Sequence, residues 1–246
     1  ILKLFSGWFS DKLGQRKWLA VLGYAFSAVA KPFFYIAQTW EAIAAIRWGD
    51  RVGKGIRTAP RDALVADSVS KPMRGLAFGL HRAMDTAGAM IGILIALLIV
   101  WLSQRNAVSL TDSTFRTVVL ISIIPAVLAV LSLILLAKDV PVEHQREAPK
   151  LSLKGLGKPF LTFLSIVAIF TLGNSSDAFL TLRAQNLGMS VMGILLMLTM
   201  FNLIYSLVST PAGGLSDKVG RKKLIVGGWL VYALIYLGFA FATASW

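Results

Sequence analysis

A run of ionisable residues interrupts an apolar part of the chain between positions 47 and 62. On a helix, a rotation of about 100° per residue places all of its charges within an arc of about 140°. An ionisable group at membrane depth costs at least about 2.5 kcal/mol on insertion scales, so this face is expected to line a wet cavity or to form ion pairs. It could attract an anionic ligand or carry protons, or it could be a salt-bridge network that only holds helices together. Its charged members are Arg47, Asp50, Arg51, Lys54, Arg57, Arg61 and Asp62.

Asp85 is a candidate partner for this charged face. Counted at 1.5 Å per residue from the expected start of its helix, it lies about 16 Å along the axis. That depth matches Lys54, so the sequence predicts that Asp85 lies within salt-bridge distance of Lys54 or Arg51. His81 and Arg82 lie about one turn earlier, and we interpret them as gate or network residues rather than ligands.

Polar residues in two later apolar segments add further candidates. Residues 173–177 combine a glycine with side chains that compete for backbone hydrogen bonds, which loosens a membrane helix, and such segments often line a ligand path. Asp177 is a second candidate proton carrier, unless it lies close enough to the surface to be simply hydrated. Asn202 and Tyr205 either hydrogen-bond to a neighbouring helix or line a cavity. The candidates for substrate recognition or proton coupling are Arg47, Asp50, Arg51, Lys54, Asp85, Asn174, Asp177, Asn202 and Tyr205.

The sequence shows no residue set typical of an enzyme or a metal protein. It has no cysteine, and neither His81 nor His144 has a companion at metal-ligand spacing. Residues 53–55 lack the spacing of a phosphate-binding loop, and no nucleophile with a base is visible. We therefore expect a protein that is not an enzyme and that uses no cofactor or metal.

A short charged turn occurs twice, once beginning at Gly7 and once at Gly213. Each copy follows an apolar stretch and precedes another, as in a duplicated bundle of membrane helices. The two glycines are expected to end helices and to let a neighbouring backbone approach closely. Asp11 and Asp217 follow at helix boundaries, where the positive end of another helix dipole could bind each carboxylate.

The chain that carries these residues has the composition of a polytopic membrane protein. It is 56% hydrophobic and 15% charged, with a mean hydropathy of +0.70, and is far more apolar than a soluble domain. Several apolar segments are long enough to cross a hydrocarbon core of about 30 Å as helices. The sequence therefore predicts an all-α membrane helix bundle. The expected spans lie near 18–38, 41–66, 75–102, 117–137, 157–182, 187–212 and 224–245, after the tail of an earlier one at 1–10.

Lysine and arginine are distributed unequally between the two ends of this predicted bundle. The turns on one side, which include both copies of the repeated turn, are rich in them, whereas the opposite turns hold only Arg105, Arg116 and Arg183. The positive-inside rule places the repeated turns in the cytoplasm. This topology accounts for most of the net charge of +13, so we expect a lipid bilayer and not nucleic acid as the partner.

The repeated pattern Gly-x-x-x-Asp-x-x-Gly-x-(Arg/Lys)-Lys between two membrane helices resembles the signature loop of the major facilitator superfamily. The resemblance covers the whole chain. It implies a major-facilitator fold of two pseudo-symmetric six-helix halves, truncated here at both ends and running from the end of helix 2 to helix 9. We expect residues 1–137 to belong to the N-terminal half, 138–158 to form a cytoplasmic linker, and 159–246 to begin the C-terminal half.

The resemblance also implies a conformational gate at the two turns. By pseudo-symmetry, Asp217 is expected near the start of a helix around Arg74 and Gly75, whereas the partner of Asp11 would lie in helix 11. The first turn has Gln15 where the second has Arg221, so its link to an acidic residue depends on Arg16. The expected gate residues are Gly7, Asp11, Gly14, Arg16, Gly213, Asp217, Gly220 and Arg221.

The function that these features imply is secondary active transport of a small-molecule substrate by alternating access, in a bacterial plasma membrane. The cationic face favours export of an amphipathic or anionic compound, with proton coupling through Asp50, Asp85 or Asp177 as a hypothesis. A non-transporting membrane sensor or assembly protein that reuses the fold is the alternative. It would keep the charge network but would need no gate.

Overall fold

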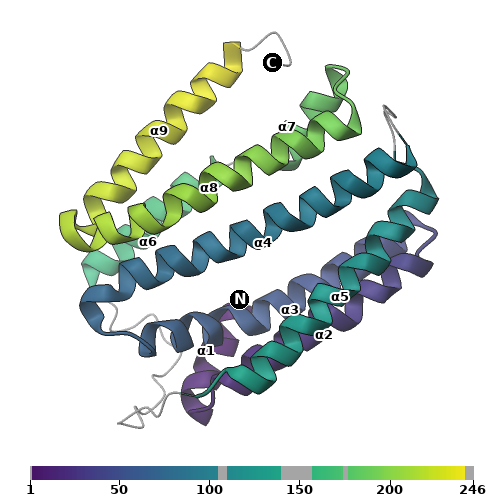
Figure 1. Ribbon diagram of the computed structural model, residues 1–246. Helices are drawn as coiled ribbons and strands as arrows, with labels where there is room; N and C mark the ends of the chain where they lie inside the picture. The colour runs from purple at the N-terminus through teal and green to yellow at the C-terminus, as the bar shows by residue number, and fades with distance from the viewer. Residues whose placement is uncertain (1, 105–109, 140–156, 174–176, 242–246) are drawn as a thin grey trace.

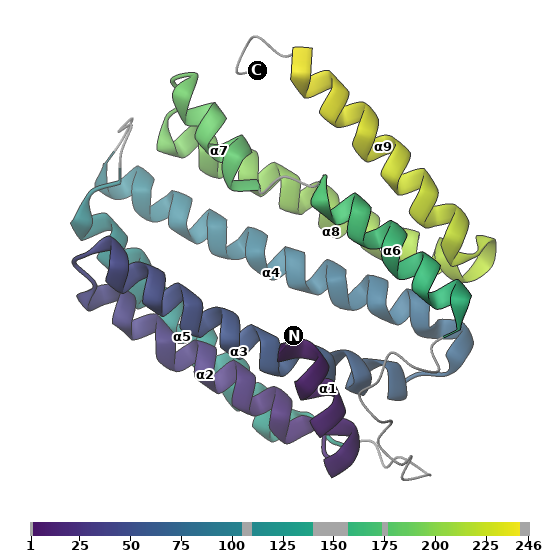
Figure 2. The ribbon, with the colours of Figure 1, turned by 180° about the vertical axis from the view of Figure 1, so that it is seen from behind.

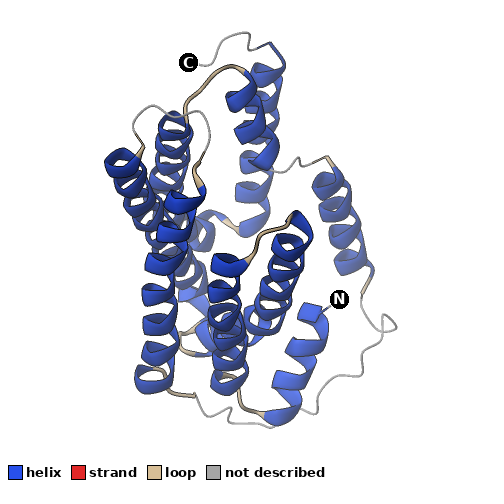
Figure 3. Ribbon diagram, turned by 90° about the vertical axis from the view of Figure 1, so that its right-hand side faces the viewer, coloured by secondary structure: helices blue, strands red, loops and turns tan. Residues whose placement is uncertain are grey.

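The computed structural model describes residues 2–104, 110–139, 157–173 and 177–241, which are helical with no strand in these ranges (Figure 3). This confirms the predicted all-α fold. The α-helices are α1 (Leu2–Leu13), α2 (Lys17–Ile36), α3 (Trp40–Asp67), α4 (Arg74–Ser103), α5 (Asp112–Leu136), α6 (Lys158–Leu172), α7 (Asp177–Asn186), α8 (Val191–Val219) and α9 (Arg221–Phe241), with a 3-10 turn, η1 (Lys71–Met73), before α4.

Helices α1, α2, α3 and α5 lie together on one side of α4 (Figures 1 and 2). The axes of α2 and α3 approach closely because glycines lie at their crossing. A Cβ atom on Gly23 would lie 2.7 Å from the carbonyl oxygen of Gly53, and a Cβ on Gly53 would lie 2.7 Å from Ser27 Oγ. On the other face of α3, Ser6 of α1 donates a hydrogen bond of 3.0 Å to the carbonyl oxygen of Gly55.

Helix α4 packs more extensively against α8 than against any helix of its own side. Small residues at the crossing permit this contact, since a Cβ on Gly79 would lie 2.6 Å from the carbonyl oxygen of Ser209 and 3.1 Å from the Cα of Gly213. In Figure 1, α4 and α8 run side by side through the middle of the molecule, with α9 beyond α8, and Figure 2, from behind, shows α6 and α7 in front of α8. The α4–α8 contact thus joins the first group of helices, α1–α5, to the second, α6–α9.

The repeated glycines do not end helices, so that part of the sequence prediction is wrong. Gly7 lies within α1 and Gly213 within α8. The helices end instead just before Gly14 and Gly220, whose φ angles are +64° and +98°. Only a residue without a Cβ adopts such angles at little cost, so these second glycines of the motif terminate the helices.

Four helical segments in the described residues are long and apolar enough to cross a membrane, namely α2, η1 with α4, α5 and α8. The predicted spans at 41–66, 157–182 and 224–245 are not among them. The first corresponds to α3, which contains many charged residues, and these lower its mean hydropathy. The second contains two shorter helices, since α6 ends at Leu172 and α7 begins at Asp177. The predicted interruption falls mostly on residues 174–176, which lie outside the described residues. The third corresponds to α9, described as far as Phe241.

The apolar helices present most of their surface outward. Only 6% of the most apolar window of α5 and of α8 is buried within the protein. Large side chains on these helices, such as Ile124 and Leu207, are 61% and 66% exposed. A surface this apolar is suited to hydrocarbon rather than water, and the backbone polar groups in the interior of a helix are bonded to one another. The chain is therefore an integral membrane protein.

Candidate functional site

The second repeated turn binds the start of α4. The Asp217 carboxylate accepts a hydrogen bond of 3.0 Å from the backbone N–H of Gly75 at one oxygen and one of 2.9 Å from Leu76 at the other. These N–H groups belong to the first turn of α4, which has no acceptor within its own helix and lies at the positive end of the helix dipole. The predicted contact between Asp217 and the region of Gly75 is confirmed.

This contact depends on the absence of a side chain at Gly75. A Cβ atom there would lie 2.6 Å from Asp217 Cγ and 2.6 Å from the carbonyl oxygen of Gly213. Both glycines are therefore required for the carboxylate to reach the α4 backbone. Gly213 contributes to the site as a point of close approach, although it does not end its helix.

The first repeated turn is held differently. Arg16 forms an ion pair with Asp67 at the end of α3 and lies 3.6 Å from Asp11 in its own turn, and it donates a hydrogen bond of 3.0 Å to the carbonyl oxygen of Ala63. Arg16 thus provides the arginine-to-acid link that Gln15 cannot form. No signal in the sequence pointed to Asp139, whose carboxylate accepts hydrogen bonds of 3.1 and 2.9 Å from the backbone N–H groups of Arg16 and Lys17.

Both repeated turns lie at the same end of the bundle (Figures 1 and 2). The end of α3 at Asp67, which holds the first turn, is close to the start of α4, which holds the second, since Arg74 donates a hydrogen bond of 3.2 Å to the carbonyl oxygen of Ala66. The two turns therefore contact neighbouring helix ends.

A cavity of about 490 Å³ lies among α2, α3, α4 and α5. Its charged lining consists of Lys31, Asp50, Arg57 and Asp85, two bases and two acids from three helices, and its remaining wall is mainly aliphatic. The sequence pointed to both acids and placed Arg57 on the charged face, but it did not identify Lys31. The available signal for Lys31 was an ionisable residue inside an otherwise uncharged span.

The two bases of the cavity are anchored to neighbouring groups. Arg57 donates a hydrogen bond of 2.8 Å to Ser27 Oγ, and its guanidinium lies 4.3 Å from the centroid of the Tyr24 ring. Lys31 donates a bond of 3.3 Å to the carbonyl oxygen of Ser122 on α5. Fixed cations opposed by two carboxylates give the cavity a defined electrostatic pattern rather than a uniform charge.

Asp85 does not pair with Lys54 or Arg51, so that prediction is wrong. Its carboxylate lies 3.5 Å from Nη1 of Arg82, three residues earlier on the same helix. Helices α3 and α4 have few contacts with each other, which leaves Lys54 within electrostatic range of Asp85 but beyond ion-pair distance. The separation of the helices, which hydropathy does not specify, decides the pairing.

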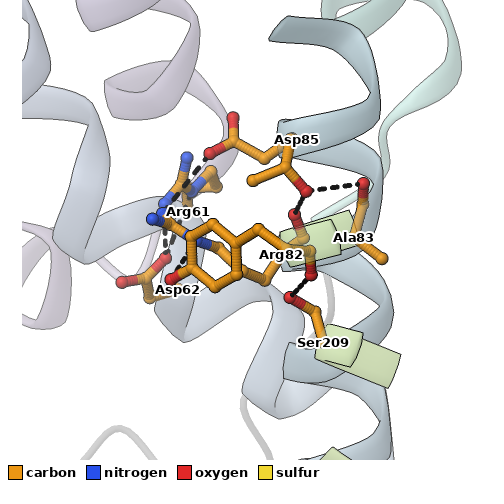
Figure 4. A network of polar contacts seen from close by, with 8 residues as sticks. Arg61, Asp62, Arg82, Ala83, Asp85 and Ser209 are labelled. Atoms are coloured by element: carbon orange, nitrogen blue, oxygen red, sulfur yellow. Dashed lines mark hydrogen bonds and ion pairs between the residues drawn. The ribbon is translucent and has the colours of Figure 1, made fainter. Parts of the chain in front are cut away.

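Arg82 extends this pair to α8. Its Nε donates a hydrogen bond of 3.1 Å to the Tyr205 hydroxyl, and its guanidinium lies 4.8 Å from the centroid of the Tyr205 ring. Figure 4 shows Arg82 and Asp85 together with the Arg61–Asp62 pair of α3. Both pairs lie within electrostatic range of His81.

The remaining charged candidates of α3 are exposed. Arg47, Arg51 and Lys54 have no ion pair among the described residues, although Lys54 lies within electrostatic range of Lys3 on α1 and Asp85 on α4. This places Lys54 toward the space between those helices. The charged face of α3 is therefore divided: Asp50 and Arg57 line the cavity, Arg61 pairs with Asp62, and Arg47, Arg51 and Lys54 are exposed.

The polar candidates of the later helices are only partly within the described residues. The side-chain amide of Asn202 donates a hydrogen bond of 2.8 Å to the carbonyl oxygen of Leu198 within α8, rather than to another helix. Asp177 begins α7, and Asn174 lies outside the described residues. In the described ranges, no group of three or more His, Cys, Asp or Glu residues is arranged to hold a metal ion.

The sequence of this chain is similar to those of known proteins. The sequence model of the Major Facilitator Superfamily matches residues 1–246. An uncharacterized MFS-type transporter of Methanocaldococcus jannaschii is 36% identical over 98% of this chain and 60% of its own length. An uncharacterized protein of Mycobacterium tuberculosis strain H37Rv is 25% identical over 92% of this chain and 55% of its own length. The chain thus spans about three fifths of the length of these relatives. No solved structure gave a significant match.

Proposed function

The chain belongs to the major facilitator superfamily, and from this premise we propose that the protein is a secondary transporter whose two helix groups alternate access to a central site. The observation that carries the proposal is the bond of Asp217 to the start of α4. It joins the second helix group to the first at one end of the bundle, through a carboxylate and a helix terminus that can separate without breaking either helix.

The contact supports a gate because it is local and readily reversed. Charge-assisted hydrogen bonds to a helix N-terminus stabilise by about 0.3–2 kcal/mol, which is small enough to be reversed by the binding of a ligand elsewhere. Gly75 and Gly213 bring the two backbones close enough for the carboxylate to bind, and Gly220 ends α8 directly after it. Arg16 and Asp11 would form the corresponding device at the first turn.

The cavity supports recognition of a substrate that has both charged and apolar parts. Its volume of about 490 Å³ is within the usual range of about 300–1,000 Å³ for small-molecule sites. Cationic Lys31 and Arg57 favour an anionic group, and the aliphatic wall favours an apolar body. We propose export of a small amphipathic or anionic compound, with Asp50, Asp85 or Asp177 carrying the coupled proton.

The distribution of basic residues supports a plasma-membrane location with both repeated turns in the cytoplasm. We assign residues 1–137 to the N-terminal half, 138–158 to the connecting linker and 159–246 to the C-terminal half. Catalysis of a chemical reaction forms no part of the proposed activity.

Transport is tested with the purified full-length protein in vesicles that contain a trapped pH-sensitive dye. Aromatic sulfonates are added one at a time, and proton movement that follows addition reports coupled flux. Asp217→Asn is expected to lower the rate about tenfold, because the amide keeps the size but loses the charge that binds the helix terminus.

The matched control is Asp112→Asn, which neutralises an exposed acid in the first turn of α5. It is expected to retain the parent rate. Equal rates for the parent and Asp217→Asn would contradict the gate. Absence of flux with every compound, together with no separation of the two helix groups by Asp217→Asn in a distance measurement, would favour the non-transporting sensor.

A further inference from the structure

A second cavity, of about 510 Å³, lies at the end of the bundle where α4 begins and α8 meets α9 (Figure 1). Its lining includes Gly75 and Gly213, the two glycines that allow Asp217 to bind the α4 backbone. It is therefore separate from the cavity among α2, α3, α4 and α5, and it adjoins the contact that joins the two helix groups. Its volume is within the range of about 300–1,000 Å³ that is usual for small-molecule sites.

Two arginines from different helix groups line this cavity. Arg74 begins α4 in the first group, and Arg221 begins α9 in the second. The described residues that line the cavity include no acid, and both carboxylate oxygens of nearby Asp217 already accept hydrogen bonds from Gly75 and Leu76. The two guanidinium groups thus border a space whose described lining supplies no counter-charge.

Both arginines have N–H groups available to a ligand. Arg74 uses its Nε for a hydrogen bond of 3.2 Å to the carbonyl oxygen of Ala66, and the other nitrogens of its guanidinium have no partner among the described residues. Arg221 is exposed, and within the described ranges its side chain has neither an ion pair nor a hydrogen bond. A guanidinium presents its N–H groups as a planar fork that matches the oxygens of a phosphate group.

The remaining wall of the cavity suits the body of a phosphate ester. Phe78 and Leu224 give it an apolar side, and the hydroxyl of Ser216 can donate a further hydrogen bond to an anion. The cavity lies at the end of the membrane helices, where phospholipid headgroups and solutes in water can both reach it.

We propose that this cavity binds a phosphate-bearing anion whose oxygens accept hydrogen bonds from Arg74 and Arg221. The anion is either the headgroup of a phospholipid or a soluble phosphate ester, since both present the same group. Because the two arginines belong to different helix groups, one bound anion links the groups beside the Asp217 contact and stabilises the joined state. This last step rests on the proposed function, because it assumes that the groups separate, whereas the binding itself does not.

Positive charge alone does not account for this arrangement. Lys222 and Lys223 follow Arg221 directly and are also exposed, but neither lines the cavity. The positive-inside rule favours basic residues at this end of the bundle, whichever face they occupy. Two arginines that border one ligand-sized space satisfy a further condition. Lys222→Gln removes an equal charge outside the cavity and is therefore the matched control.

The test uses two probes with the same phosphate monoester, glycerol 3-phosphate and dioctanoyl phosphatidic acid, which differ only in the acyl chains. Their binding to the purified full-length protein in neutral detergent is measured by calorimetry at low ionic strength, because salt screens exposed charges. Arg74→Gln and Arg221→Gln should each weaken binding about tenfold or more, and Lys222→Gln by no more than about twofold. Arg221→Lys should recover part of the affinity, since lysine restores the charge without the fork.

Comparison of the two probes identifies the source of the anion. Phosphatidic acid that binds about tenfold tighter than glycerol 3-phosphate, with a dependence on Arg221, would assign a lipid headgroup, because the acyl chains add apolar burial. Similar affinities would assign a soluble ester. Should Arg74→Gln fail to fold, exposed Arg221 decides. No binding of either probe, or equal losses in Arg221→Gln and Lys222→Gln, would overturn the inference.

Distances between the two helix groups test the second step. Nitroxide labels are placed on cysteines that replace exposed Ser68 and Lys223, one in each group, with any native cysteine removed. In Asp217→Asn, where the groups are expected to separate, a saturating probe should lower the separated population about threefold or more. Adding Arg221→Gln should abolish this effect. Binding of the probe without a change in the separated population would reject the link between the groups.

The same measurements distinguish failure of the anion site from failure of the proposed function. If Asp217→Asn leaves the distance unchanged, the gate fails, while binding that depends on Arg74 and Arg221 still establishes the site. If Asp217→Asn separates the groups but neither probe binds, the gate stands and the anion site is rejected.

Discussion

At the scale of single residues, the two copies of the repeated turn are held by different chemistry. Asp217 binds backbone N–H groups at the start of α4, whereas Arg16 binds the carboxylate of Asp67 at the end of α3. The first is a charge–dipole contact between the two helix groups, and the second is an ion pair within one group. A duplicated sequence therefore does not imply duplicated contacts, because each copy meets a different neighbour.

The ion pair at the first turn predicts a stability effect. Arg16 is only 14% exposed, so Asp67→Asn would leave its guanidinium without its main counter-charge and should destabilise the protein by about 1–3 kcal/mol. The measurement is the thermal unfolding midpoint of the full-length protein in detergent. Glu41→Gln, at an exposed acid on the same helix, is the control and should change the midpoint little. Equal midpoints for Asp67→Asn and the parent would show that the pair contributes nothing.

At the scale of elements, glycines determine which helices approach closely and which remain apart. Gly79 lies against the α8 backbone, whereas a Cβ atom on Gly88 or Gly92 of the same helix would meet nothing within 4 Å. Gly88 lies nine residues after Gly79, about 180° around the helix, so it faces away from α8. Gly88 and Gly92 line the cavity instead.

This difference predicts opposite outcomes for two substitutions on α4. Gly79→Ala places a methyl group 2.6 Å from the carbonyl oxygen of Ser209, so the two helices must shift apart and the protein should lose about 1–3 kcal/mol. Gly88→Ala has space and should be neutral or stabilising by up to about 1 kcal/mol. Unfolding midpoints of both variants, read beside the parent, check the prediction. A Gly79→Ala variant as stable as Gly88→Ala would contradict it.

At the scale of the whole molecule, the arrangement combines an apolar exterior with a charged interior. The surfaces of α5 and α8 are largely exposed and apolar, while Lys31, Asp50, Arg57 and Asp85 converge on one cavity. Placing ionisable groups around one cavity reduces the free-energy cost of holding each of them inside the membrane, because opposite charges and polar neighbours replace water.

The placement of both repeated turns at one end of the bundle predicts how the protein lies in its membrane. Single cysteines at Lys12 and at Lys222, one near each turn, should react with a membrane-impermeant thiol reagent in inside-out vesicles and be protected in intact cells. A cysteine at exposed Gln38, in the turn between α2 and α3 at the other end, should show the reverse pattern. Opposite accessibility of the Lys12 and Lys222 positions would be incompatible with the fold.

Much of the architecture was predictable from the sequence. Apolar segments of membrane length and the repeated turn both depend on local composition, which a chain carries regardless of its surroundings. The resemblance carried by the repeat added one long-range contact, that of Asp217 with Gly75, because pseudo-symmetry relates positions that are distant in sequence.

Side-chain partners were decided only by the tertiary structure. Asp85 bonds to Arg82 instead of Lys54, Asp139 caps the start of α2, and Lys31 joins the cavity from the middle of α2. Each outcome depends on how the helices are rotated and how far apart they lie. A change of an ångström or two in the distance between two charged groups decides whether they form an ion pair, such as that at 3.5 Å, or only lie near each other. Hydropathy and periodicity state which face of a helix is polar, but the packing of glycines against neighbouring backbones decides which polar groups meet.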